Sequence, residues 1–202
     1  MFENWFAKND SIFYYDFETT GLNQYHDKII EYTFLTEDKN MISSLVNPEI
    51  KIPPKVISIT KITDEMLVDK PLMWQSLPKI TKFIESGTGT KFLIAHNNDN
   101  FDKIFLQNNL KKYDYNCKNY SWKFIDTLLL AKKILPNISS YSLKSLCKHF
   151  NIKVDGSHRS TADTKMVRKL YHALCKELIK KLGTNYEELI SNPALIYNYL
   201  YE

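Results

Sequence analysis

Cysteine is scarce in this chain of 202 residues, and its three cysteines, Cys117, Cys147 and Cys175, lie far apart. Their number is odd and their spacing fits no metal-binding pattern, which argues against a disulfide framework and against a cysteine-based zinc site. Free thiols in a reducing compartment are the expected state.

Long apolar runs are also absent. No window is long and apolar enough to span a bilayer, and the N-terminus has no basic stretch followed by an apolar run. We therefore expect a soluble, intracellular protein with no membrane partner. The cytoplasm is the expected location, and the nucleus or a viral factory stay open as alternatives.

Arginine is almost missing, since only Arg159 and Arg168 interrupt a basic set made of lysine. With frequent Asn, Ile and Tyr, this is typical of an A/T-rich coding sequence. The net charge of +4 permits a nucleic-acid partner without requiring one. A hydrophobic content of 44% and a charged content of 25% predict an ordered domain with a substantial core.

The order of apolar patterns predicts an α/β fold, a central mixed β-sheet flanked by helices. We expect one domain at 1–183 and a helical extension, 184–202, packed on or adjoining it. Pro78 is expected near a helix start and Gly183 at a helix end. The expected strands are 11–17, two strands within 28–48 joined by a polar turn near 38–40, 91–96 and 122–126. The expected helices are 77–86, 100–110, 127–135, 141–150, 160–182 and one or two within 185–202, with an extended loop at 47–54.

The stretch "FYYDFETTG" places Asp16 and Glu18 at the end of an aromatic strand. Residues two apart on a strand point to the same side, so these carboxylates would lie together and repel each other. A positive charge between them would remove the repulsion. The alternative is a simple turn, because Asp and Thr are common after a strand and Gly21 suits a turn.

Two further acidic motifs follow along the chain. In "AHNNDNFDKIFL" a polar loop leads from a strand into a helix that carries Asp102. The alternative there is capping, with Asp99 or Asn100 at the N-cap and Asp102 facing the positive end of the helix dipole.

The third motif, "HRSTADT", opens the longest helix and contains Asp163. Ser160 as N-cap with Asp163 three positions later resembles a capping box, which is the alternative explanation for this acid. His158, in a polar loop, has the alternative of being a solvated surface residue.

Together the three motifs favour a site over three separate structural roles. Each follows an apolar segment or begins a helix, and such ends converge at the rim of an α/β sheet. Four carboxylates suit hard divalent cations such as Mg²⁺ or Mn²⁺. A pair of metals with a nearby imidazole is a known arrangement for phosphodiester hydrolysis.

The three motifs resemble those of DEDDh 3′→5′ exonucleases, the DnaQ-like family of the RNase H-like superfamily. "DFETTG" matches the first motif, "AHNNDNFDKIFL" resembles a form of the second with one additional residue, and "HRSTADT" matches the third, with histidine five positions before aspartate. The similarity runs from about residue 11 to 182, and 47–67 is similar to the proofreading subunit of bacterial DNA polymerase III.

This resemblance implies a set of site residues. The metal ligands would be Asp16, Glu18, Asp102 and Asp163, with Asp16 bridging two divalent cations, Mg²⁺ or Mn²⁺, and Asp102 acting partly through water. His158 would be the general base. The implied substrate-binding residues are Phe17, Thr19, Thr20, Gly21, Leu22, Lys61, His96 and Asn97.

Four of the implied substrate contacts have particular roles. Leu22 would be an apolar wedge against the terminal bases. His96 and Asn97 would line the groove or serve the structure. At Thr60-Lys61-Ile62 the chain departs from the family's frequent "HGI", so Lys61 would meet a phosphate instead.

The implied activity is release of nucleoside 5′-monophosphates from the 3′ end of a single strand, with DNA favoured and RNA trimming as the main alternative. A DNA polymerase or replication factor is the expected protein partner. A non-catalytic binding module on the same fold is the alternative from a different class.

Overall fold

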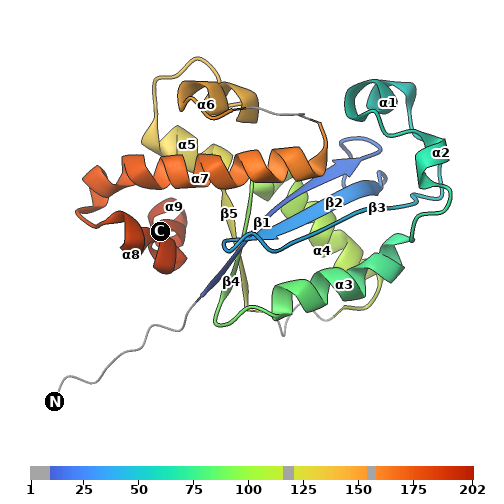
Figure 1. Cartoon of the computed structure of the whole chain (residues 1–202), viewed down its shortest axis with the longest axis horizontal. Coiled ribbons are helices and arrows are strands. Elements are labelled where there is room, and N and C mark those ends of the chain that lie inside the picture. Colours follow the sequence, from blue (N-terminus) through green and yellow to red (C-terminus); the bar gives the residue numbers. More distant parts are fainter. Residues whose placement is uncertain (1–9, 116–120, 154–157) are drawn as a thin grey trace.

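The computed structural model describes residues 10–115, 121–153 and 158–202. Five strands form one sheet in the order β3-β2-β1-β4-β5. β1 pairs antiparallel with β2, and β2 with β3, whereas β1 and β4, and β4 and β5, run parallel. The expected mixed sheet flanked by helices is confirmed (Figure 1). The strands are β1 (Ser11–Thr19), β2 (Ile29–Thr36), β3 (Met41–Leu45), β4 (Lys91–Ala95) and β5 (Trp122–Asp126).

Helices cover both faces of the sheet (Figure 1). The helix bounds are α1 (Pro54–Thr60), α2 (Asp64–Leu67), α3 (Met73–Glu85), α4 (Asp102–Lys112), α5 (Thr127–Ile134), α6 (Leu143–His149), α7 (Ser160–Leu182), α8 (Tyr186–Ser191) and α9 (Pro193–Tyr201), with a short 3₁₀ turn, η1 (Asn98–Asn100). Within the described ranges, no helix has the length and apolar character needed to cross a bilayer.

The alternation of β1 divides the core into two layers. Ile12 and Tyr14 point into a cluster with α5, α6 and α7, whereas Phe13, Tyr15 and Phe17 point into a second cluster with α3 and α4. Asp16 and Glu18 follow the even-numbered side, so the fold delivers both carboxylates to the α7 face.

The C-terminal segment joins the α7-side core. Leu189 of α8 and Ile196 of α9 are fully buried in the same cluster as Tyr14 and Phe92. Figure 1 shows α8 and α9 folded back beside the C-terminal half of α7.

Three local expectations were wrong or incomplete. Pro78 was expected near a helix start, but α3 begins at Met73 and Pro78 lies inside it. Ser160 was considered as an N-cap, but it is the first residue of α7 and Arg159 occupies the cap position. The short helices α1 and α2 had no predicted counterpart, because they are only 7 and 4 residues long and follow a proline-punctuated stretch.

Candidate active site

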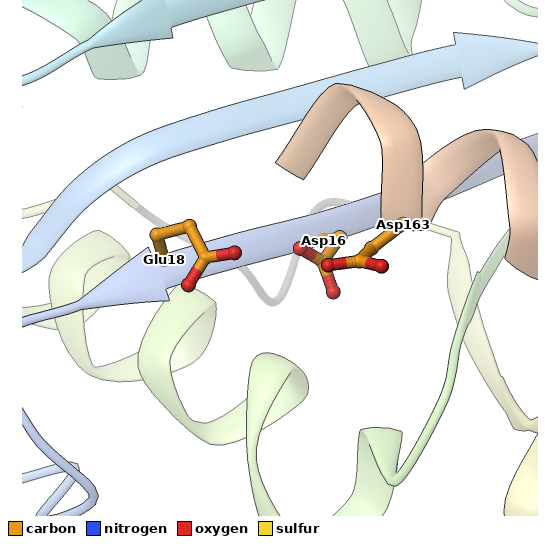
Figure 2. Close-up of side chains that lie close together, drawn as sticks. All are labelled: Asp16, Glu18 and Asp163. Carbon is orange, nitrogen blue, oxygen red and sulfur yellow. The ribbon is translucent and has the colours of Figure 1, made fainter. Parts of the chain in front are cut away.

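Three carboxylates meet where β1 passes beneath the start of α7. Asp16, Glu18 and Asp163 each contribute one carboxylate oxygen to a group of three oxygens that lie within 4.8 Å of one another. Figure 2 shows the side chains of Asp16 and Glu18 rising from β1 toward Asp163 on the first turn of α7. Segments more than 140 residues apart in sequence thus build one acidic cluster.

This cluster is electrostatically costly without a cation. Burial raises the pKa of Asp16 well above its usual range, and the neighbouring charges of Asp102, Asp163 and Glu18 raise it further. Burial, with the charge of Asp163, raises the pKa of Glu18 to about 8. The pKa of Asp163 is also raised by burial, against a lowering by its hydrogen bond from His158. Crowded carboxylates with raised pKa values form a set of oxygen ligands that suits a hard divalent cation.

Asp102 lies beside the trio but is not part of it. Its carboxylate is buried, and its Oδ1 accepts a hydrogen bond of 3.1 Å from the backbone N–H of Phe17, between the two acids of β1. Burial raises the pKa of Asp102. Neither Asp99 nor Asn100 caps α4, since the cap position is Phe101 and no side chain caps it. The N-cap part of the alternative is therefore wrong, whereas Asp102 does lie in the first turn of α4, at the positive end of the helix dipole.

His158 lies one residue before the cap of α7, in the left-handed region with φ 67°. Its backbone N–H donates to Asp163 Oδ2 at 2.9 Å, which ties the loop to the cluster. Its Nε2 lies 3.2 Å from the Nζ of Lys144. An ammonium can only donate, so a hydrogen bond between these two atoms requires Nε2 to be the acceptor.

The loop after β1 is built around Asp27. Thr20 donates to Asp27 Oδ1, and Asn23 N–H donates to Asp27 Oδ2. A Cβ on Gly21 would lie 2.4 Å from Asp27 Oδ2, so a larger residue there would displace the Asp27 side chain. The loop presents Leu22 to solvent, 81% exposed.

The other expected substrate contacts are placed differently. The side chains of Phe17, Thr19 and Thr20 are buried. Lys61 ends α1, is exposed, and donates to the carbonyl of Ser58.

His96 and Asn97 have structural partners. Both ring nitrogens of His96 are engaged, Nδ1 with Thr127 Oγ1 at 3.0 Å and Nε2 with the carbonyl of Tyr141 at 2.9 Å. The backbone N–H of Asn97 donates to Asp126. These contacts favour the structural alternative for His96.

Asp126 is a positioning residue that sequence reasoning missed. It is fully buried at the end of β5. Its carboxylate accepts hydrogen bonds from the backbone N–H groups of Asn97, Asp99 and Leu128, so it caps α5 and holds the loop that leads to Asp102. The available signal was an aspartate directly between a strand and a helix, the position of an N-cap.

Glu31 and Arg159 were also missed. Glu31 lies directly opposite Glu18 on β2 and is almost fully buried. Arg159 Nη2 lies 2.6 Å from Glu31 Oε1, and Arg159 Nε is within 3.2 Å of both carboxylate oxygens. The signal for this pair was a glutamate inside an apolar strand, where an unpaired charge would be costly.

The comparisons with known proteins agree with this geometry. A family model described as an exonuclease, RNase T type, matches residues 13–171. The chain belongs to this exonuclease family. The membership confirms the resemblance to DnaQ-like exonucleases and makes the protein a nuclease, a hydrolase of phosphodiester bonds.

Two curated relatives give the range of contexts in which such a chain occurs. The DNA polymerase III subunit epsilon of Treponema pallidum is 34% identical over 194 residues, which cover 91% of this chain and 86% of that protein. The PolC-type DNA polymerase III of Oceanobacillus iheyensis is 32% identical over 184 residues, which cover 89% of this chain but 12% of the relative.

Solved structures share the fold. Exonuclease X in complex with a 5′-overhanging duplex DNA is 26% identical, with a TM-score of 0.63 and coverage of 88% of this chain and 95% of that one. Exonuclease I is 17% identical, with a TM-score of 0.72 and coverage of 91% and 44%. The latter likeness shows the fold alone, and the RNase H-like fold is confirmed.

Proposed function

We propose that this exonuclease removes nucleotides from the 3′ end of single-stranded DNA, releasing nucleoside 5′-monophosphates with the help of two divalent cations, Mg²⁺ or Mn²⁺. The observation that carries the proposal is the acidic trio of Asp16, Glu18 and Asp163, with Asp102 beside it. Cation ligands of oxygen type alone favour Mg²⁺ or Mn²⁺ over softer metals.

The residues divide the work. Asp16 would contact both cations, Glu18 and Asp163 would each complete the set around one of them, and Asp102 would act partly through water. Two bound cations would activate the attacking water and stabilise the leaving 3′-oxygen. His158 would accept the proton of the attacking water at its exposed Nε2, after release from Lys144.

Exposed side chains that follow β1 in the chain support strand binding. Leu22 and Tyr25, on the loop that follows β1, are 81% and 77% exposed. Tyr25 also lines a groove with Lys28, Lys111 and Lys112. Apolar and aromatic surfaces can stack on bases, and lysines can contact phosphates, so this surface fits a single strand. Lys61 is a further candidate phosphate contact.

The proposed DNA substrate and a polymerase partner rest on the relatives. One is named as a DNA polymerase III subunit, another as a PolC-type polymerase, and exonuclease X was solved with DNA. RNA trimming is the second candidate, because discrimination depends on a few contacts to the 2′-hydroxyl.

The experiment is a nuclease assay on 5′-labelled single-stranded DNA and RNA of one sequence, in EDTA, Mg²⁺, Mn²⁺ or Ca²⁺. We expect stepwise shortening of the DNA from its 3′ end in Mg²⁺ or Mn²⁺, none in EDTA, and none in Ca²⁺ although Ca²⁺ binds. Asp16→Asn is the matched inactive protein and Asp69→Asn the exposed control. Cleavage in metal-free buffer would refute the two-cation proposal, preference for RNA would favour trimming, and strand binding without cleavage would favour a non-catalytic module.

A further inference from the structure

The two arginines of the chain both fasten α7 to the β2 side of the sheet. Arg159, at the cap of α7, pairs with Glu31 in β2. Arg168, nine residues farther along, pairs with Glu37 just after β2, with Nη2 and Oε1 at 2.7 Å. In a chain that otherwise uses lysine, both arginines form ion pairs with glutamates on the β2 side of the sheet, and Arg159 does so through two of its nitrogens.

The pair at Arg159 replaces the cap that α7 lacks. No side chain of the cap residue satisfies the first turn. Instead Glu31 Oε2 accepts the backbone N–H of Ser160 at 2.8 Å, while the other contacts of that carboxylate come from Arg159. A strand residue thus closes the helix start, a position where orphan N–H groups need an acceptor.

Hydroxyl groups reinforce the same junction. Thr33, fully buried two residues after Glu31, has its Oγ1 2.8 Å from Ser160 Oγ and 3.0 Å from Thr161 Oγ1. The start of α7 is therefore fixed to β2 by a partly buried polar network, and such networks specify a single arrangement when every member has a partner.

This junction lies between the two functional groups of the third motif. His158 directly precedes Arg159, and the N–H of Asp163 donates to the carbonyl of Arg159 at 3.1 Å. A displacement of Arg159 would therefore move His158 and Asp163 together, relative to Asp16 and Glu18 on β1.

We propose that Glu31 and Arg159 form a positioning pair, which sets Asp163 and His158 against the carboxylates of β1 for cation binding and catalysis. The inference rests on the proposed function. In metal sites, residues that do not touch the metal orient the ligands that do. We assign this role to Glu31 and Arg159.

Arg159→Lys tests the proposal because it keeps the charge and removes the planar fork. If the pair only balanced charge, Mn²⁺ affinity would not change. If it positions Asp163, the metal affinity should fall by about 10–100-fold, the usual effect of losing such a partner. The turnover number for single-stranded DNA should fall with it, while the KM for the strand changes little.

Arg168→Lys is the matched control, since it breaks the same type of pair on the same helix away from the trio. It should lower the melting temperature and leave Mn²⁺ affinity unchanged. Thr33→Val is a second test that removes hydroxyl bonds at the junction without altering any charge, and it serves if Arg159→Lys fails to fold. It should weaken Mn²⁺ binding in the same direction.

Mn²⁺ affinity is measured by titration calorimetry on EDTA-treated, dialysed protein, with melting in EDTA as the check of folding. Folded Arg159→Lys and Thr33→Val with wild-type Mn²⁺ affinity and turnover would overturn the positioning role. Failure of the wild type to bind Mn²⁺ would refute the proposed function instead, so the two failures are distinct.

Discussion

At the scale of single residues, the alternatives for the acidic motifs are separated by where each carboxylate points. The carboxylate of a cap or turn residue accepts hydrogen bonds from nearby backbone N–H groups, as Asp126 does from Leu128 at the start of α5. Asp16, Glu18 and Asp163 instead face one another across two elements. That they lie together could be predicted from the sequence, because each motif is recognised by its local spacing. The sequence was not sufficient for Glu31 and Arg159, whose pairing depends on which strand lies beneath α7.

His158→Ala should lower the turnover number by about 10²–10⁴-fold, the usual contribution of a general base. The affinity for the strand should change little, because the imidazole is proposed to meet the attacking water and not the bases. Steady-state and single-turnover cleavage of labelled DNA in Mn²⁺ would measure both quantities. His149→Ala, which removes another histidine at the end of α6, is the matched control. A turnover near that of the wild type would leave His158 as a surface residue.

Glu18 should make the metal-free protein less stable as pH rises. Its pKa is about 8 in the folded chain against an ordinary value of 4.5, so between these values the native state holds a proton that the unfolded state has released. Stability falls with pH wherever the native state binds more protons. Urea unfolding in EDTA at several pH values from 5 to about 8 should show this fall.

Glu18→Gln should flatten that slope without abolishing it, because the pKa values of Asp16, Asp102 and Asp163 are raised as well. Glu49→Gln, at an exposed position, should keep the wild-type slope. An identical slope in Glu18→Gln and wild type would show that this carboxyl is ionised throughout the range.

At the scale of elements, strongly periodic segments were the predictable part of the fold. The hairpin of β2 and β3 and the long helix α7 ended by Gly183 follow from alternation and helical spacing. Pro78 inside α3 did not follow, since α3 begins at Met73, where the backbone N–H of Leu72 donates to the side chain of Gln75. The start of α7 at residue 160 was expected, whereas the acceptor that closes it was not. The helix α7 begins where Glu31 supplies an acceptor, and no local pattern contains that residue.

The helices α8 and α9 are expected to be part of the same cooperative unit as the sheet. Ile196 is fully buried in the cluster that contains Tyr14 and Phe92. Ile196→Ala should therefore reduce the free energy of unfolding by about 2–5 kcal/mol, the range for truncating a buried isoleucine. Denaturant unfolding should keep a single transition.

Ile59→Ala is the control for this truncation, since Ile59 is of the same type but 43% exposed on α1. It should cost far less than Ile196→Ala. Equal, small losses in the two variants would mean that the C-terminal helices dock without contributing to the stability of the sheet, in line with a separate extension at 184–202.

At the scale of the whole molecule, β1 lies at the centre of the sheet and also carries the crowded carboxylates of Asp16 and Glu18. β1 has neighbours on both sides, β2 and β4. Its apolar residues are almost completely buried, which anchors the strand while Asp16 and Glu18 repel each other at its end. Burial of the apolar residues of β1 thus offsets the destabilisation caused by the crowded carboxylates, and such a trade-off between function and stability is common.

Metal should therefore be linked to the stability of the whole chain. A ligand that binds only the native state stabilises it by mass action, so Mn²⁺ should raise the melting temperature of the wild type. Asp16→Asn keeps the shape and removes one charge from the crowded site, so in EDTA it should melt above the wild type. It should also lose most of the rise caused by Mn²⁺, together with activity. Asp163→Asn should lose most of the rise too.

Thermal melts of wild type, Asp16→Asn, Asp163→Asn and the exposed control Asp69→Asn, each in EDTA and in Mn²⁺, separate the site from the structural alternatives. If Asp16 only formed a turn and Asp163 only capped a helix, replacement would be neutral or cost up to about 1–2 kcal/mol, and metal would have no effect. Equal Mn²⁺ shifts in all four proteins would place metal binding elsewhere on the molecule. Loss of the shift in the two site variants, with the shift retained in Asp69→Asn, would locate the cations between β1 and the start of α7.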